Sequence, residues 1–229
     1  MKIMDIHSHT FYSSCGKDAP EVIIERAIES GIEIFGISDH NYGIGERKEQ
    51  YYKEISDLKE KYKNKIKLLV GIEITTRPHL FDIKQDELLC FDYCLVEHLD
   101  QPETNGYDNP IEFLTQFKIP TGIAHTNLFG YCQSTGRDPK EFSNALANEN
   151  IFWEMNVNYD SIHSYREHGY VKEFLESDEQ QKTIRDAGVM LSVGFDGHKV
   201  EDYLPERVTD MCKKLENFRS AEEILLKNK

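Results

Sequence analysis

Short apolar runs alternate with amphipathic stretches along the whole chain. Seven runs have the length and apolar content of buried strands, at 1–6, 32–38, 65–75, 93–96, 121–124, 152–157 and 190–194. Apolar residues at helical spacing between them predict helices at 20–30, 47–63, 109–117, 139–148, 170–187, 205–217 and from Ser220 onward. The run at 65–75 is almost continuously apolar, as expected of a strand covered on both faces.

This alternation gives seven β–α units. Over 229 residues they average about 33 residues each, which is enough for parallel strands joined by crossover helices. No linker, low-complexity stretch or repeat divides the units, so residues 1–229 are expected to form a single domain. A parallel sheet with outer helices is either an open doubly wound sheet or a closed barrel.

The strand ends distinguish these two architectures. Every predicted strand runs into an ionisable or metal-competent residue at or near its carboxyl end. In strand order these are His7 and His9, Asp39 and His40, Glu73, Glu97 and His98, His125, Glu154 and Asn156, and Asp196 and His198. In a (β/α) barrel all such ends open on one face, whereas in an open sheet only those near the switch point converge. The pattern favours an α/β fold with a closed or nearly closed (β/α)7 barrel.

Histidines and carboxylates dominate this set. Six of the nine histidines lie at predicted strand ends, and imidazoles and carboxylates are the ligands of Zn, Fe and Mn sites. His7 and His9 share one strand face because side chains alternate with a period of two, so both can reach one ion. A carboxylate between two clusters, such as Glu73, can bridge two ions.

Four further polar residues are candidates for a supporting role. Asp5 and Asp39 each lie near a ligand histidine and either orient its ring through the other nitrogen or make ordinary strand-end hydrogen bonds. Glu154 and Asn156 on the sixth strand either support the ligands or line the pocket.

Charge and cysteine content narrow the functional classes. Lys and Arg total 27 against 41 for Asp and Glu, and the net charge of −14 disfavours nucleic-acid binding through a basic patch. No apolar run approaches the ~18 residues of a membrane span, and an early acid and histidine exclude a signal-peptide core. Five cysteines without paired spacing indicate reduced thiols and a cytoplasmic protein.

Several short motifs follow one another along the chain: Asp5-x-His7-x-His9-Thr10, Ser38-Asp39-His40, Gly71-Ile72-Glu73, His98, Ala124-His125 and Gly194-Phe195-Asp196-Gly197-His198. With these motifs the sequence resembles the PHP (polymerase and histidinol phosphatase) family over residues 5–198. The resemblance implies a distorted seven-stranded, TIM-like (β/α) barrel that carries two or three divalent ions, Zn, Fe or Mn. It also implies three ligand sets: His7, His9, Glu73 and Asp196; Glu73, His98 and His125; and His40 and His198 with a histidine six residues after His9.

The chain departs from this pattern at two points. Cys15 stands where the family usually has the last of these histidines. A thiolate there would favour zinc over manganese, and otherwise Cys15 points elsewhere and the third site is weakened or lost. There is also no obvious pair of arginines for a phosphate, although Arg77, Arg137 and Arg166 are candidates.

The resemblance implies hydrolysis of a small phosphomonoester, and histidinol phosphate is the family's best-known example. Glu73 would take part in catalysis through the metal ions, and Asp196 or a histidine such as His198 would protonate the leaving group. The alternatives are a PHP-type nuclease or polymerase-associated module, a non-catalytic metal-binding barrel, and an amidohydrolase-type enzyme. The amidohydrolases also carry His-x-His after their first strand but bridge their metals from strand four, whereas Glu73 belongs to the third predicted strand.

Overall fold

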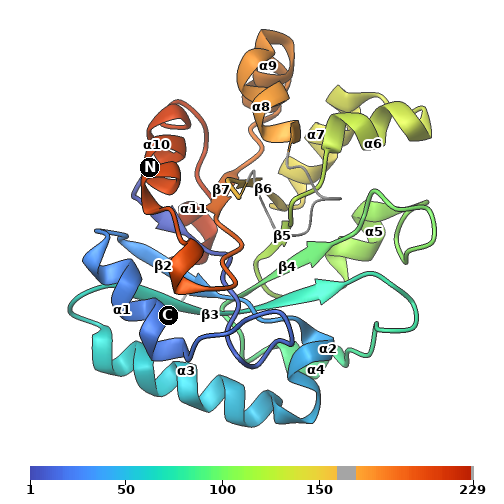
Figure 1. Ribbon diagram of the computed structural model, residues 1–229. Coiled ribbons are helices and arrows are strands. Elements are labelled where there is room, and N and C mark those ends of the chain that lie inside the picture. Colours follow the sequence, from blue (N-terminus) through green and yellow to red (C-terminus); the bar gives the residue numbers. More distant parts are fainter. Residues whose placement is uncertain (159–168, 228–229) are drawn as a thin grey trace.

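Seven parallel strands form one sheet in which spatial order follows sequence order (Figure 1). The computed structural model describes residues 1–158 and 169–227. The strands are β1 (Met4–Asp5), β2 (Ile34–Ile37), β3 (Lys67–Thr75), β4 (Tyr93–Glu97), β5 (Thr121–Ile123), β6 (Phe152–Asn156) and β7 (Leu191–Gly194). The seven predicted strands are thus confirmed, with ends shifted by a few residues.

The sheet closes on itself between its first and last strands. The amide of Ile6 donates to the carbonyl of Val193 at 3.1 Å, and the amide of Asp196 donates to the carbonyl of His7 at 2.8 Å. Ser8 and Gly197 form a parallel bridge just beyond the strands. The architecture is therefore a nearly closed, distorted (β/α)7 barrel, and the open sheet is excluded.

Helices surround the strands (Figure 1). The longer ones are α1 (Pro20–Glu29), α3 (Lys48–Tyr62), α5 (Pro110–Thr115), α6 (Leu128–Thr135), α7 (Pro139–Asn148), α8 (Gly169–Glu176), α9 (Asp178–Ala187) and α10 (Pro205–Lys214). Single turns are α2 (Asn41–Ile44), α4 (Gln85–Leu88), α11 (Glu222–Leu225), and the 3-10 turns η1 (Gly45–Arg47) and η2 (Val200–Asp202). Among the described residues, no helix has the length and apolar character to cross a bilayer.

Two of the longer helical segments differ from the prediction, and the single turns α2 and α4 were not predicted. The single helix expected at 170–187 is interrupted at Ser177, whose backbone is extended and whose hydroxyl accepts a hydrogen bond from the amide of Gln180. A serine that caps a new helix in this way ends the preceding one. Helix α6 was not predicted, although its Asn127 cap and the left-handed Gly136 (φ 69°) after it are both recognisable end signals.

One tyrosine crosses the interior of the barrel. Tyr93 on β4 is fully buried, and its hydroxyl donates to the carbonyl of Ile6 at 2.6 Å. Its ring passes two glycines: a Cβ at Gly36 would lie 2.2 Å from the tyrosine hydroxyl, and a Cβ at Gly71 would lie 2.3 Å from the ring. Glycine at these strand positions is therefore what allows Tyr93 to link β4 to β1.

Replacing Gly71 with alanine is expected to destabilise the protein. The added methyl group overlaps the Tyr93 ring, which buried neighbours prevent from moving, so the free energy of unfolding should fall by about 1–3 kcal/mol or more. Urea unfolding of the two proteins measures this difference. Gly169→Ala is the matched control, because no described atom outside its own helix lies within 4 Å of the added methyl group there. Equal stability of Gly71→Ala and Gly169→Ala would contradict the packing described.

Candidate metal centre

Side chains from all seven strands meet at the carboxyl end of the barrel. Their positions follow from the parallel topology, which brings every strand's carboxyl end to the same mouth. The buried histidines and acids there are His7, His9, His40, Glu73, Glu97, His98, Glu154, Asp196 and His198, and the ring of His125 joins them. Residues spread over almost two hundred positions thus form one cluster.

The carboxylate of Glu73 lies at the middle of this cluster and has no exposed surface. Its Oε1 is 3.3 Å from Nε2 of His7 and 3.1 Å from Nε2 of His125. Its Oε2 is 3.4 Å from Nε2 of His9 and 2.7 Å from Nδ1 of His40. One acid on β3 therefore contacts imidazoles that follow β1, β2 and β5.

Asp196 is the second acid with several imidazole neighbours. Its Oδ1 lies 3.0 Å from Nε2 of His9, 3.5 Å from Nε2 of His7 and 3.7 Å from Nε2 of His198. The backbone of Asp196 is left-handed, with φ 56°, a conformation that is uncommon for residues other than glycine. Such strain is found where the surrounding structure holds a side chain in place for a functional reason.

Ligand atoms in the cluster approach each other closely enough to share ions. Within each of five overlapping groups the candidate donor atoms lie within 4.8 Å of one another. The groups are His7–His9–Glu73, His7–His125–Asp196, His9–Asp196–His198, His40–Glu73–Glu97 and His9–Cys15–His40. Nitrogen and carboxylate donors in this number suit Zn, Fe and Mn, and the last group adds a sulfur donor.

Two buried polar atoms lack hydrogen bonds in the described part of the chain, which favours a bound cation over a hydrogen-bonded network at this position. Nδ1 of His40 and Oε2 of Glu73 are 2.7 Å apart, yet within the described residues neither has a hydrogen-bond partner of acceptable geometry. Buried polar atoms without such a partner are rare in proteins. A divalent cation would satisfy both lone pairs, so the donor set fits divalent metal binding.

Burial and neighbouring positive charge have opposite effects on the pKa values of the acids in the cluster. Burial by itself raises the pKa of Glu73, but the charges of His40 and His7 outweigh it and hold this pKa well below its usual range. The pKa of Asp196 is lowered in the same way, because His7 and His198 outweigh burial. Burial lowers the pKa of His7, but Glu154 and Glu73 raise it well above the ordinary value. The cluster therefore holds ionised carboxylates that require positive charge beside them.

Glu154 on β6 holds two parts of the cluster together. Nδ1 of His7 donates to Oε1 of Glu154 at 2.7 Å, and the amide of His125 donates to Oε2 at 2.8 Å. The first contact leaves Nε2 of His7 directed towards Glu73 and Asp196. A carboxylate in this position fixes the tautomer and orientation of a ligand histidine.

The other three supporting residues bind backbone groups. Asp5 accepts hydrogen bonds from the amides of His7 (3.3 Å) and Phe195 (3.0 Å), across the closure of the barrel. In the described residues, the hydrogen bonds of Asp39 likewise come from a loop backbone and hydroxyl, not from an imidazole. Asn156 accepts from the amide of Asn158 at 3.0 Å. The hydrogen bonds of Asp5 and Asp39 thus join the strand ends to neighbouring backbone and hydroxyl groups.

Glu97 belongs to the cluster although sequence analysis gave it no role. Its Oε1 is 3.5 Å from Nδ1 of His40, and its Oε2 is 3.1 Å from Nδ1 of His98. The alternation along β4 contained the signal, because Tyr93 faces the barrel interior and Glu97, four residues later, faces the same side.

His98 is outside the five donor groups found among the described residues. Its backbone is left-handed (φ 69°), and its Nδ1 is 3.3 Å from the hydroxyl of Thr75.

Two of the three candidate arginines, Arg77 and Arg137, belong to the described residues, and their hydrogen bonds go to groups outside the cluster. The guanidinium of Arg137 donates to the carbonyl of Asp108 and lies over the ring of Tyr131. The half-buried Arg77 follows β3, and neither arginine forms an ion pair or hydrogen bond with a cluster residue among the described residues. Arg166 lies outside the described residues.

Structural comparison finds similar barrels in solved proteins. Histidinol phosphate phosphatase from Lactococcus lactis, solved with zinc, L-histidinol and phosphate, matches with a TM-score of 0.66 at 15% identity, over 95% of this chain and 97% of that one. A putative histidinol phosphatase from Listeria monocytogenes matches with a TM-score of 0.57 at 15% identity, over 87% and 96%. A chain of archaeal ribonuclease P with mature tRNA gives 0.55 at 14% identity, over 98% and 94%. At these identities the likeness establishes the fold.

Sequence comparison gives the family. No curated protein matches the chain at a significant level. The model of the PHP domain matches residues 5–198. This range includes strands β2 to β7 in full, β1 from Asp5 on, and every member of the five donor groups. The chain therefore belongs to the PHP domain family.

Proposed function

We propose that this protein is a metal-dependent phosphoesterase that hydrolyses a small phosphomonoester. The observation that carries the proposal is the fully buried Glu73 carboxylate in contact with four imidazoles, a donor set built for more than one divalent ion. Family membership and the likeness to two histidinol phosphatases support the same class of reaction. The zinc and phosphate in the Lactococcus lactis protein support Zn as the first metal to test, with Fe and Mn as alternatives.

The ligands would be shared between two or three ions. His7, His9, Glu73 and Asp196 would hold one ion, and Glu73 with His125 would hold part of a second. Divalent ions bound there supply positive charge for the phosphate and make water a better nucleophile at neutral pH. In the part of the chain that the structure describes, neither Arg77 nor Arg137 forms an ion pair or hydrogen bond with the cluster, so these ions would supply the positive charge closest to the phosphate.

The group that protonates the leaving oxygen must be reachable from solvent, and the outer residues of the cluster meet this condition. Asp196 and His198 retain 6% and 9% of their surface exposed, whereas His7 and Glu73 retain none. The Asp196 carboxylate is 3.7 Å from Nε2 of His198. Because its pKa is held well below the usual range, the Asp196 carboxylate has no proton to give, and we assign the general-acid role to His198.

A groove beside His40 has the size to receive the rest of a small substrate. The ring of Tyr42 stacks on His40 with centroids 4.8 Å apart, and Tyr42 and Asn41 form one wall of the groove. His79 and Lys84 line it from the segment between β3 and β4, and its volume is about 880 Å³. Pockets of this size bind small molecules.

Nucleic acid is the alternative class of substrate, and the archaeal ribonuclease P chain shares this fold. A net charge of −14 disfavours a phosphate backbone as a ligand. We expect the zinc-loaded protein to hydrolyse an aryl phosphate and histidinol phosphate at least about tenfold faster, per kcat/KM, than a short oligonucleotide. A preference for the oligonucleotide would favour the nuclease alternative, and bound metal without any turnover would favour a non-catalytic barrel.

The Glu73→Gln variant is expected to lose both metal and activity. The neutral amide cannot balance divalent ions, and metal-centred stabilisation is worth several kcal/mol, so kcat should fall by roughly a thousandfold. Elemental analysis and a phosphatase assay on the same preparation measure the two losses. Glu223→Gln is the control, since Glu223 pairs with Arg219 at the surface and lines neither the cluster nor the groove. Full turnover by Glu73→Gln would refute the proposal.

Glu154→Gln tests positioning rather than ligation. The amide retains an oxygen that can accept from His7 Nδ1 but removes the charge that raises the basicity of the ring. Metal affinity should weaken by about 10- to 100-fold, with activity recovered at high metal concentration. Competition with a chelating indicator measures the affinity, and an unchanged value would show that Glu154 has no part in metal binding.

A further inference from the structure

Tyr42 is an exposed aromatic side chain beside the metal cluster. It follows β2, two residues after the candidate ligand His40, and 40% of its surface is exposed. Among the described residues it is one of four large hydrophobic side chains left exposed, and of these four it alone lines the groove beside the cluster. An exposed ring in a groove next to a reaction centre is a surface on which a substrate can pack.

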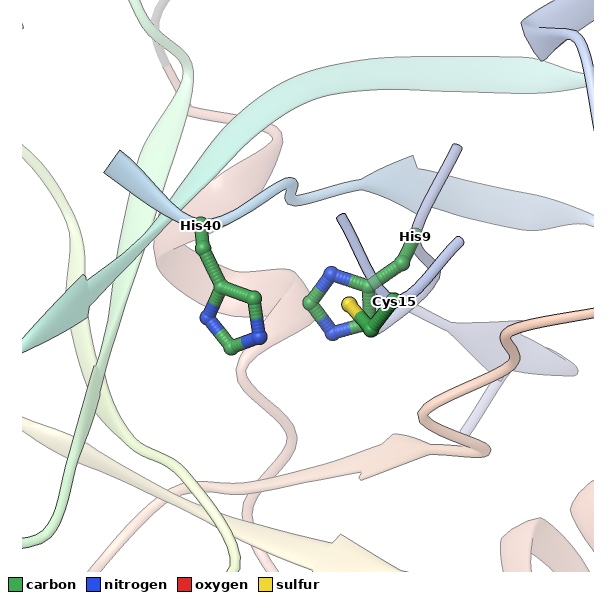
Figure 2. Close-up of side chains that lie close together, drawn as sticks. All are labelled: His9, Cys15 and His40. Carbon is green, nitrogen blue, oxygen red and sulfur yellow. The ribbon is translucent and has the colours of Figure 1, made fainter. Parts of the chain in front are cut away.

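The Tyr42 ring continues a row of stacked rings that begins inside the cluster. The rings of His9 and His40 lie side by side, with centroids 4.5 Å apart (Figure 2). The Tyr42 ring stacks on His40 with centroids 4.8 Å apart and 23° between the ring planes. His40 in turn lies 2.7 Å from Glu73, the central carboxylate of the cluster. A substituent on a phosphate held at the cluster would therefore lie close to the Tyr42 ring.

Hydrogen bonds of the neighbouring Asn41 fix the wall of the groove to which Tyr42 belongs. The side-chain oxygen of Asn41 accepts from the amide of Thr75 at 3.0 Å, and its side-chain nitrogen donates to the carbonyl of Leu80 at 3.2 Å. Leu80 also lines the groove, so one buried side chain ties together two segments that form it. A binding surface that is ordered in advance loses less conformational entropy when a ligand arrives.

The groove carries a net negative charge. Five acids and two lysines line it, and both lysines lie beside the same acid. Nζ of Lys48 is 2.6 Å and Nζ of Lys84 is 3.5 Å from the carboxylate of Glu87. The other four acids are exposed, and they are Glu46, Glu49, Asp82 and Asp86. Because like charges repel, a carboxylate or a second phosphate on the substrate is disfavoured in this groove.

We propose that Tyr42 determines substrate specificity by stacking on a leaving group that is a planar ring without negative charge. The inference rests on the proposed function and adds the chemical class of the leaving group. Stacked aromatic rings attract each other beyond the effect of the area they bury, so a flat ring gains more from Tyr42 than a saturated ring of the same size. Tyr42 therefore contributes to binding of the substrate rather than to the chemical step.

Binding of phosphonates tests the ring preference without hydrolysis, because the P–C bond replaces the bond that a phosphoesterase breaks. The zinc-loaded full-length protein should bind phenylphosphonate about three- to tenfold more tightly than cyclohexylphosphonate, as measured by calorimetric titration. Tyr42→Ala should lose this preference, and Tyr42→Phe, which keeps the ring, should retain it. Leu89→Ala is the control, because Leu89 is also exposed, at 56%, but does not line the groove. No preference in the wild-type protein, or the same preference in Tyr42→Ala, would overturn the inference.

Kinetics separate stacking on the substrate from support of the His40 ring. With phenyl phosphate, Tyr42→Ala should raise KM about three- to tenfold and leave kcat and zinc content unchanged, since it removes binding that the ground state and transition state share. A loss of zinc, or an equal fall in kcat for phenyl phosphate and methyl phosphate, would show that Tyr42 only positions His40 and would also overturn the inference.

A carboxylate on the ring tests the effect of the groove's charge. The para-carboxyphenylphosphonate should bind at least about threefold more weakly than phenylphosphonate, and the difference should shrink as the salt concentration rises. Equal or tighter binding of the carboxylated ring would overturn the assignment of an uncharged leaving group.

Failure of this inference is distinguishable from failure of the proposed function. If Tyr42→Ala behaved as the wild-type protein while hydrolysis still depended on Glu73, only the specificity assigned to Tyr42 would be wrong. A wild-type chain that neither binds divalent ions nor hydrolyses any phosphomonoester would overturn both.

Discussion

The need to balance buried negative charge at the barrel mouth governs this molecule. Glu73, Glu97, Glu154 and Asp196 are almost or completely removed from solvent within one small region. An ionised carboxylate transferred from water is strongly destabilised unless a cation or hydrogen bonds compensate it. The surrounding imidazoles supply part of this compensation, and they are also the ligands through which divalent ions would supply the rest. Stability and metal binding are consequently coupled at the same residues.

Closure of the barrel and construction of the site depend on shared contacts. Asp5 joins the two ends of the sheet by accepting from the amides of His7 and Phe195, which flank the ligand positions. Asp196 donates its own amide to the carbonyl of His7 and adopts its left-handed backbone at the same point. A barrel that failed to close would separate His7 from Asp196. The backbone strain at Asp196 is therefore offset by the same contacts that close the barrel.

The loop that carries Cys15 is held in place through its backbone. Asp39 and Gly16 hold the loop through its backbone, so the residue at position 15 can change while the hydrogen bonds to Thr10 and Ser13 remain. A substitution at this position would therefore change one side chain beside the cluster and leave the hydrogen bonds that hold the loop in place.

Local pattern was enough to foresee the strands, their parallel arrangement and the histidines at their ends, because strand length, alternation and strand-to-helix order are encoded in neighbouring residues. It also placed Glu73 among several imidazoles. The break at Ser177, the backbone hydrogen bonds of Asp39 and the contact of Glu97 with His40 depend instead on groups distant in the chain. Side-chain direction at a barrel mouth is set by closure, twist and packing of all seven strands together, and no short window of residues contains that information.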